Sequence, residues 1–226
     1  MSGAPGGFSS RLVVTALAAM VAAAVAIGGV PDADAQQRTA RGEPAPFSRA
    51  EQARLSRGSL VTRSSVRARG QLRLIGGTSW QVVRQPADVV WRAVNDTSRY
   101  PDMLPRVSEA RVVSRERGGR TVYVRHGGGG VDARYYLRAR VDGGRKDMRF
   151  GLDDRRPHTI RAAYGFLTVR AWRPGQSLIT YGVMADVGTG VLVGLLRPTI
   201  HAWILRVPQT MKQFIETRGW RRYRTG

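Results

Sequence analysis

The sequence predicts an α+β fold in which a curved antiparallel β-sheet wraps around a long C-terminal α-helix, with two short helices after the first strand. Two patterns carry this prediction. Between residues 109 and 187, six segments with apolar residues at every second position are separated by short turn clusters, as in an antiparallel meander. From Leu196 onward, apolar residues recur at steps of three and four, which is typical of a helix with one apolar stripe. Because the strands are apolar on one face only, we expect the helix to cover that face.

Composition narrows the class of protein. The chain has 226 residues, of which 42% are hydrophobic, so it can build a core of its own. There is no cysteine, which excludes disulfides and thiolate metal sites. The formal net charge of +21 would attract nucleic acid or anionic lipid. The arginines are spread along the whole chain, however, so we expect a solvated basic surface, no nucleic-acid partner and at most peripheral contact with an anionic membrane.

The N-terminus has the layout of a secretory signal. Arg11 precedes an apolar stretch over residues 12–27, and small residues follow at Ala33 and Ala35. We therefore interpret residues 1–35 as a signal peptide and expect a secreted or periplasmic protein. The alternative is an uncleaved membrane anchor, because a stretch over residues 12–30 could just cross a bilayer.

The next segment, residues 36–105, is predicted to contain a linker, the first strands and two short helices. We interpret residues 36–58 as a linker with a possible short helix, because Ser48 and Glu51 have capping-box spacing. Residues 59–83 read as the first strand or two. Pro86 opens a helix that ends near Asp96, and a second short helix or loop follows over residues 98–105.

The remaining elements are strands and one helix. Strands are predicted over residues 109–115, 121–125, 131–141, 147–152, 159–172 and 177–187. In the clearest of them, Val131 to Val141, apolar and charged residues fall on opposite faces. A helix is predicted over residues 198–218, with a kink at Pro208, and residues 220–226 read as a basic tail.

Three short motifs resemble a known family. They are Pro86-Ala87-Asp88-Val89-Val90-Trp91, Asp96-Thr97-Ser98-Arg99-Tyr100-Pro101 and Pro105-Arg106-Val107. Together they are similar to the opening of the START-like (SRPBCC) helix-grip superfamily, in its polyketide cyclase/dehydrase and coenzyme Q-binding branch. The resemblance implies one helix-grip domain over residues 59–219, with a cavity between sheet and helix that apolar ligands enter past the helix N-terminus. It does not fix the function, because this superfamily hosts carriers, receptors and enzymes.

Candidate ligand-binding residues follow from strand parity, the helix stripe and the predicted entrance. Small residues at inward positions, Ala133 and Ala139, favour a cavity, although each candidate could instead fill a solid core or anchor a loop. The candidates are Tyr100, Met103, Leu104, Tyr135, Leu137, Ala139, Tyr164, Phe166, Tyr181, Ile200, His201, Ile204, Val207 and Met211.

The sequence offers no clear catalytic set. His126 and His158 are expected to be exposed, and His201 could hydrogen-bond the head group of a ligand. No Ser-His-Asp or Cys-His arrangement, metal site or cofactor site can be assembled. The sequence therefore favours an exported carrier of a lipid, isoprenoid or other apolar small molecule. A cyclase/dehydrase-like enzyme and a non-catalytic envelope protein with a filled core remain alternatives.

Overall fold

The computed structural model describes residues 46–127, 132–188 and 191–224. The predicted signal peptide, residues 1–35, lies outside this part of the chain. The chain divides into two compact units, residues 1–47 and 48–226, and the sheet and its helices belong to the second. Within the described ranges, no helix is both long and apolar enough to cross a membrane.

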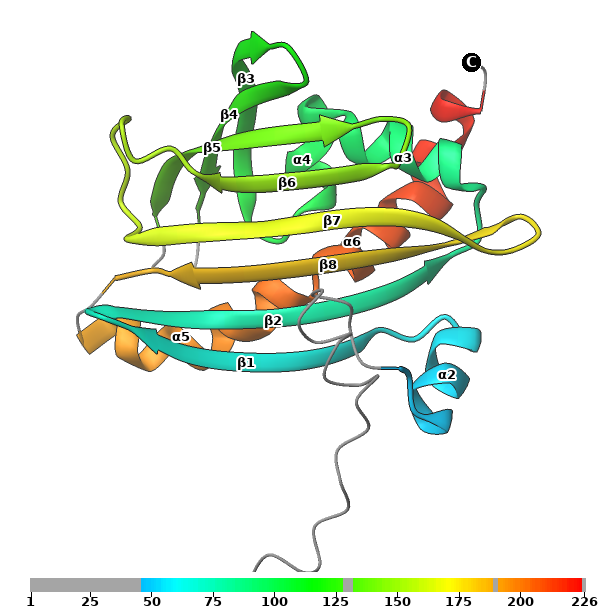
Figure 1. The fold of residues 1–226 in the computed structure, drawn as a ribbon, viewed down its shortest axis with the longest axis horizontal. Helices are drawn as coiled ribbons and strands as arrows, with labels where there is room; N and C mark the ends of the chain where they lie inside the picture. Colours follow the sequence, from blue (N-terminus) through cyan, green and yellow to red (C-terminus); the bar gives the residue numbers. More distant parts are fainter. Residues whose placement is uncertain (1–45, 128–131, 189–190, 225–226) are drawn as a thin grey trace, which may run out of the picture. The chain divides into compact units, whose positions relative to one another are not determined.

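The described residues of the second unit form eight strands and several helices (Figure 1). The strands are β1 (Val61–Arg69), β2 (Leu72–Val83), β3 (Val107–Glu116), β4 (Gly119–His126), β5 (Ala133–Asp142), β6 (Asp147–Leu152), β7 (Ala162–Arg173) and β8 (Gln176–Asp186). The α-helices are α2 (Arg49–Ser56), α3 (Ala87–Asn95), α4 (Tyr100–Met103), α5 (Val191–Leu205) and α6 (Val207–Phe214). Short helices follow at η1 (Thr97–Arg99), η2 (Ile215–Gly219) and η3 (Trp220–Tyr223).

All eight strands form one antiparallel sheet in the order β1-β2-β8-β7-β6-β5-β4-β3. The predicted meander is therefore correct from β3 to β8. The hairpin of β1 and β2 then pairs with the last strand, β8, so β1 and β3 are the two edges of an open sheet. The sheet bends around α5 and α6, which cross its concave side (Figure 1). This confirms the predicted α+β helix-grip class.

The predicted C-terminal helix is two helices with a break between them. It begins at Val191, before the predicted start at Pro198, and α5 ends at Leu205. Helix α6 then starts at Val207 with Pro208 in its first turn. Proline lacks a backbone donor and clashes with the preceding turn, which explains the break where the sequence predicted a kink.

The structure also changes the position of the two short helices. They follow β2 and not the first strand, because residues 59–83 form a complete hairpin. Its turn contains Gly70 in a left-handed conformation, with φ of +57°.

The domain includes pieces at both ends that the sequence boundaries of 59 and 219 leave out. At the start, Glu51 of α2 forms an ion pair of 2.8 Å with Arg63 of β1. At the end, Tyr223 of η3 is buried and its hydroxyl donates to Asp96 Oδ2 at 2.7 Å. The segment expected to be a basic tail is thus anchored to the end of α3.

The solid core lies toward one end of the sheet. Trp91 and Val94 of α3, Met103 of α4, Phe214 of α6 and Ile179 of β8 belong to one buried cluster. Helix α5 is attached to the sheet by a hydrogen bond, in which His201 Nε2 lies 2.6 Å from the Gly76 carbonyl oxygen of β2. The sheet and the helices are therefore closely packed at one end, and the remaining concave surface is available for a site.

Candidate functional site

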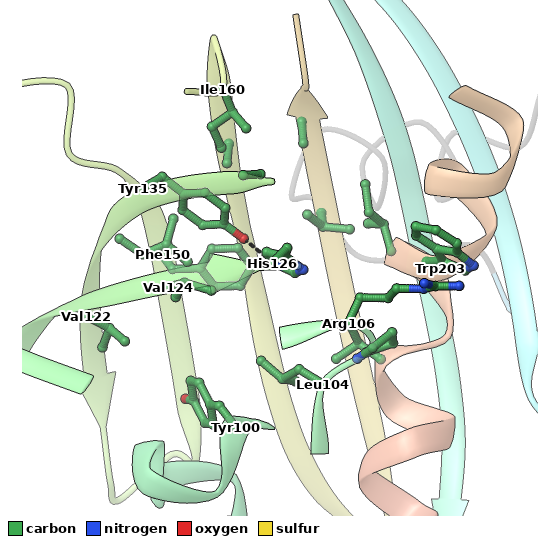
Figure 2. Close-up of a pocket in the computed structure, with 18 of the residues that line it drawn as sticks. Tyr100, Leu104, Arg106, Val122, Val124, His126, Tyr135, Phe150, Ile160 and Trp203 are labelled. Atoms are coloured by element: carbon green, nitrogen blue, oxygen red, sulfur yellow. Dashed lines mark hydrogen bonds between the residues drawn. The ribbon is translucent and has the colours of Figure 1, made fainter. Parts of the chain in front are cut away.

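A cavity of about 390 Å³ lies between the concave face of the sheet and helices α5 and α6. Figure 2 shows side chains from the strands on one side of it and Trp203 of α5 on the other. Ligand pockets in proteins typically have volumes of about 300–1,000 Å³. The cavity is large enough for a small organic ligand, and most of its lining is apolar.

The lining combines residues from α3, α4, strands β4 to β8, helices α5 and α6, and the loops beside them. The α3 to β3 segment contributes Val94, Tyr100, Leu104, Pro105 and Arg106, and β4 contributes Val122, Val124 and His126. Asp132 borders the cavity just before β5. Strands β5 and β6 supply Ala133, Tyr135, Leu137, Ala139, Met148 and Phe150. Thr159, Ile160, Ala163, Leu167, Tyr181, Val183, Ala185 and Val187 follow from β7, β8 and their flanking loops, and Ile200, Trp203, Ile204, Val207 and Met211 from the helices.

Small residues on the inner face create the space. Ala133 and Ala139 line the cavity, as their strand parity predicts, and Ala163 and Ala185 extend the row of small side chains. Gly165 acts in the same way, because a Cβ there would lie 2.6 Å from the Phe150 ring. The absent side chain therefore leaves room for that ring.

Most of the predicted lining residues do border this cavity. They are Tyr100, Leu104, Tyr135, Leu137, Ala139, Tyr181, Ile200, Ile204, Val207 and Met211.

The predicted orientation of Tyr164 and Phe166 is wrong. Tyr164 is 42% exposed, and neither residue lines the cavity. Gly182 explains where the Phe166 ring goes, since a Cβ at that position would lie 2.3 Å from it on the outer face. Both faces of β7 carry apolar residues, so its parity is ambiguous in the sequence, and the inward set is Ala163 and Leu167.

Two further predicted residues have structural positions instead. Met103 is fully buried in the core, and its carbonyl accepts a hydrogen bond of 2.6 Å from the Thr210 hydroxyl. His201 does not line the cavity, because its ring faces β2 and pairs with the Gly76 carbonyl. Each residue joins the C-terminal helices to another part of the domain, Met103 through α4 and His201 through β2.

His126 is a cavity residue, contrary to the expectation that it is exposed. Its Nε2 lies 2.6 Å from the Tyr135 hydroxyl, and the two rings stack with centroids 5.6 Å apart (Figure 2). Burial lowers the pKa of His126, although a hydrogen bond to the Pro105 carbonyl opposes this effect. Because that carbonyl can only accept, the neutral ring donates to it and accepts from Tyr135 at Nε2. The alternation of Val122, Val124 and His126 along β4 is the signal that could have predicted this position.

Besides Tyr135, the tyrosines Tyr181 and Tyr100 bring hydroxyl groups to the lining. Burial raises the pKa values of Tyr135 and Tyr181, so both phenols stay protonated. The Tyr181 ring stacks on Phe150 with centroids 6.0 Å apart. The Tyr100 hydroxyl donates to the Val94 carbonyl at 3.2 Å, which ties α4 to α3. The interior is thus apolar with a few neutral hydroxyl groups, an arrangement that can orient a ligand through one or two hydrogen bonds.

Charge enters the lining at Arg106 and Asp132. The Arg106 guanidinium lies over the Trp203 ring at 4.3 Å from its centroid (Figure 2). Asp132 pairs with Arg125 at 3.1 Å and also with Arg134, and these two arginines lower its pKa. The carboxylate is therefore already compensated. In the part of the chain that the structure describes, no cluster of His, Asp and Glu could hold a metal ion.

The comparisons agree with this architecture. A family described as polyketide cyclase / dehydrase and lipid transport matches residues 83–193. No curated protein matches the sequence. Among solved structures, a protein from Thermus thermophilus is 14% identical, with a TM-score of 0.54, covering 62% of this chain and 95% of that one.

Two other solved structures have similar folds and named activities. The Zhui aromatase/cyclase from Streptomyces sp. R1128 is 14% identical with a TM-score of 0.54, covering 64% of this chain and 95% of its own. A STAR-related lipid transfer protein from Xanthomonas axonopodis is 12% identical with a TM-score of 0.52, covering 68% of this chain and 99% of its own. At these identities the likeness concerns the fold. One of these structures is named as an aromatase/cyclase and the other as a lipid transfer protein, so proteins with both names share this fold.

Proposed function

We propose that this chain, which has a helix-grip fold and matches the polyketide cyclase / dehydrase and lipid transport family over residues 83–193, binds and carries an apolar small molecule, such as a lipid or isoprenoid. The observation that carries the proposal is the cavity of about 390 Å³ with its mainly apolar lining. Burying apolar surface contributes roughly 25 cal/mol per Å², so an apolar ligand gains affinity from almost the whole wall.

The polar groups of the lining favour ligand binding as the function rather than catalysis. The imidazole of His126 is hydrogen-bonded to Tyr135 on one side and to the Pro105 backbone on the other. The Asp132 carboxylate is paired with arginines. These groups are held in place by protein partners, as expected for residues that orient a ligand.

We place this carrier outside the cytoplasm, after cleavage of the signal peptide near Ala35. The support is the sequence of residues 1–35, with its charged, apolar and small-residue regions. A net charge of +21 favours peripheral contact with an anionic membrane, from which a lipid ligand could be collected.

The direct test is to purify the chain without its first 35 residues, extract it with organic solvent and identify the extract by mass spectrometry. We expect a lipid or isoprenoid in stoichiometric amount, or saturable binding of the neutral fluorescent probe N-phenyl-1-naphthylamine by the stripped protein. The absence of both a co-purified molecule and probe binding would exclude the carrier function.

A second function, a cyclase/dehydrase-like enzyme, is favoured by one observation. The hydrogen-bonded pair His126–Tyr135 faces the same cavity as Tyr181, so a proton donor and acceptor adjoin the apolar space. The test is turnover of a polyketide-like substrate by the wild type and its loss in Tyr135→Phe, with Tyr164→Phe on the outer face as the control. Equal turnover in both variants would exclude this pair as the acid–base group. The third alternative, an envelope protein with a filled core, is disfavoured by the volume of the cavity.

A further inference from the structure

We propose that Arg106 binds the oxyanion head group of a single-chain amphiphile whose apolar chain occupies the cavity. The inference rests on the proposed carrier function and adds the chemical class of the ligand. It predicts a carboxylate or phosphate monoester at the head and excludes a preference for uncharged lipids.

The position of Arg106 is the first support. Arg106 lies between α4 and β3 and has φ of +60°, a left-handed backbone conformation that residues other than glycine rarely adopt. The Gly127 amide donates to the Arg106 carbonyl at 3.0 Å, which holds this backbone at the end of β4. Backbone strain of this kind persists only where the surrounding structure imposes it, and it is frequent at functional sites. Here it places an exposed arginine side chain in the lining of an apolar cavity.

The state of the guanidinium is the second support. Its flat face lies over Trp203, with 4.3 Å from its central carbon to the ring centroid. Stacking uses the face of the group and leaves the N–H donors in its plane available, which is the geometry that binds an oxyanion with two parallel hydrogen bonds. Among the described residues, no carboxylate forms an ion pair with Arg106.

The charge balance of the lining is the third support. Asp132 is the acidic residue of the lining, and Arg125 and Arg134 already compensate it. Burial lowers the pKa of His126 and so favours its uncharged form, in a ring that lies 2.6 Å from the Tyr135 hydroxyl. Of the described lining side chains, Arg106 thus supplies the one uncompensated charge, and it is positive. An amphiphile with its chain in the cavity and an anion at Arg106 satisfies both the apolar wall and this charge.

The experiment compares three ligands with the same chain length. Palmitate, hexadecyl phosphate and 1-hexadecanol are titrated at pH 8 against the protein saturated with N-phenyl-1-naphthylamine, and displacement of the probe gives each Kd. The variants are Arg106→Gln, which removes the charge, and Arg106→Lys, which keeps it without the planar fork. Arg117→Gln, in the exposed turn between β3 and β4, lowers the net charge by the same amount and is the control.

We expect the wild type and Arg117→Gln to bind palmitate or hexadecyl phosphate at least about tenfold more tightly than 1-hexadecanol. The anion that shows the preference identifies the head group. Arg106→Gln should abolish the preference while keeping its affinity for 1-hexadecanol, and Arg106→Lys should retain only part of it.

Equal affinities of the wild type for the three ligands would overturn the inference and leave the carrier function standing. The same holds if Arg117→Gln loses as much anion affinity as Arg106→Gln, because the effect would then come from the general positive field. If neither the probe nor any of the ligands binds, the proposed carrier function itself fails. The probe retained by Arg106→Gln also serves as the check that this variant is folded.

Discussion

His126 is the residue whose environment differs most from what its type suggests. A histidine exposed to water next to a run of glycines would titrate near pH 6.5. In the fold its ring lies against Tyr135 inside an apolar wall, and burial lowers its pKa. A neutral imidazole is the form that can both donate to the Pro105 carbonyl and accept from the Tyr135 hydroxyl. Protonation would remove the acceptor at Nε2 and place a charge in the wall of the cavity.

We therefore predict that acid weakens the fold through His126. Its pKa is lower in the folded than in the unfolded state, so below about pH 6.5 the unfolded chain takes up a proton that the folded chain resists. Stability should fall as the pH decreases through this range, until the pH drops below the folded pKa. NMR titration of the ring should give a pKa below 6.5, and urea unfolding between pH 7.5 and 5.5 should show a smaller pH dependence in His126→Gln. The control is the exposed His158→Gln, and a His126 pKa of 6.5 or higher would contradict the prediction.

At single positions, the sequence predicts the lining where one face of a strand is clearly apolar. Strand parity places Tyr135, Leu137 and Ala139 correctly, because the opposite face of β5 is charged. It fails for Tyr164 and Phe166 because β7 is apolar on both faces, and Gly182 on the neighbouring strand leaves room for the Phe166 ring on the outer face. That contact joins two strands, so the periodicity within β7 does not contain it.

Helix α2 illustrates how one side chain can serve two elements. Ser48 Oγ accepts from the Glu51 amide at 3.2 Å, and the Glu51 carboxylate accepts from the Ser48 amide at 2.8 Å, which completes the capping box. The same carboxylate accepts two hydrogen bonds from Arg63 of β1. Arg63, followed by the hydrogen bond from Ser48, lowers the pKa of Glu51 to about 2. The cap that starts the helix is therefore also its link to the sheet.

We predict that Ser48→Ala destabilises the domain by about 1 kcal/mol, the usual cost of removing an N-cap side chain. The free energy of unfolding in urea measures this effect. Ser59→Ala, just after the helix at an exposed position, is the matched control and should change stability by less than about 0.5 kcal/mol. An equal loss in both variants would mean that the capping box does not contribute in solution.

The C-terminal segment, η3, is attached to α3 by a buried tyrosine. Tyr223 donates to Asp96 Oδ2 at 2.7 Å, and its backbone carbonyl accepts from Arg92 Nε at 2.9 Å. Its ring belongs to the same buried cluster as Trp91 and Phe214. The last residues thus close the core beside α3.

We predict two steps of destabilisation at this position. Tyr223→Phe removes a hydrogen bond to a carboxylate and should cost about 1.5–3 kcal/mol. Tyr223→Ala also removes the ring and should cost at least about 3 kcal/mol in total. Thermal and urea unfolding check both values, and Tyr164→Phe, at an exposed tyrosine, should be neutral. Stability unchanged in Tyr223→Ala would show that η3 is not part of the folded domain.

At the level of elements, most of the topology follows from the sequence. The turn clusters predict the strands from β3 to β8, and Pro208 predicts the interruption between α5 and α6. The pairing of β2 with β8 does not follow, because it joins Ile75 to Ala185 across more than a hundred residues. No local pattern encodes the partner of a distant strand. The resemblance to a known superfamily, through the motifs around Trp91 and Tyr100, predicted the helix-grip class but not this pairing.

In the molecule as a whole, the close-packed core and the cavity adjoin one another on the concave side of one sheet, and Ala139, Leu167 and Met211 belong to both. Trp91, Met103 and Phe214 fill the space where α3, α4 and α6 meet the strands. Toward α5, small residues stand among the larger lining side chains, and Ala133, Ala163 and Ala185 leave the cavity open. The sequence could suggest this space from its inward alanines, but its volume depends on how far the bent sheet stands from the helices. That distance is a property of the assembled fold.

This division predicts that ligand binding and stability can be separated by one substitution. Ala163→Leu adds a larger side chain to the cavity wall, where open space can receive it. Binding of N-phenyl-1-naphthylamine should fall at least about tenfold, while filling the void should raise the unfolding free energy by about 1 kcal/mol. Overpacking of a solid core would instead destabilise the domain by about 1–3 kcal/mol.

The neighbouring substitution Ala162→Leu is the control, because successive residues of a strand point to opposite faces and Ala162 does not line the cavity. It should leave probe binding unchanged. Fluorescence titration and thermal unfolding of the two variants decide between two physical pictures. Lost binding with retained stability in Ala163→Leu means that the ligand occupies the space between sheet and helices. Retained binding with lower stability means that this part of the wall is already filled in solution and that the probe binds elsewhere on the molecule.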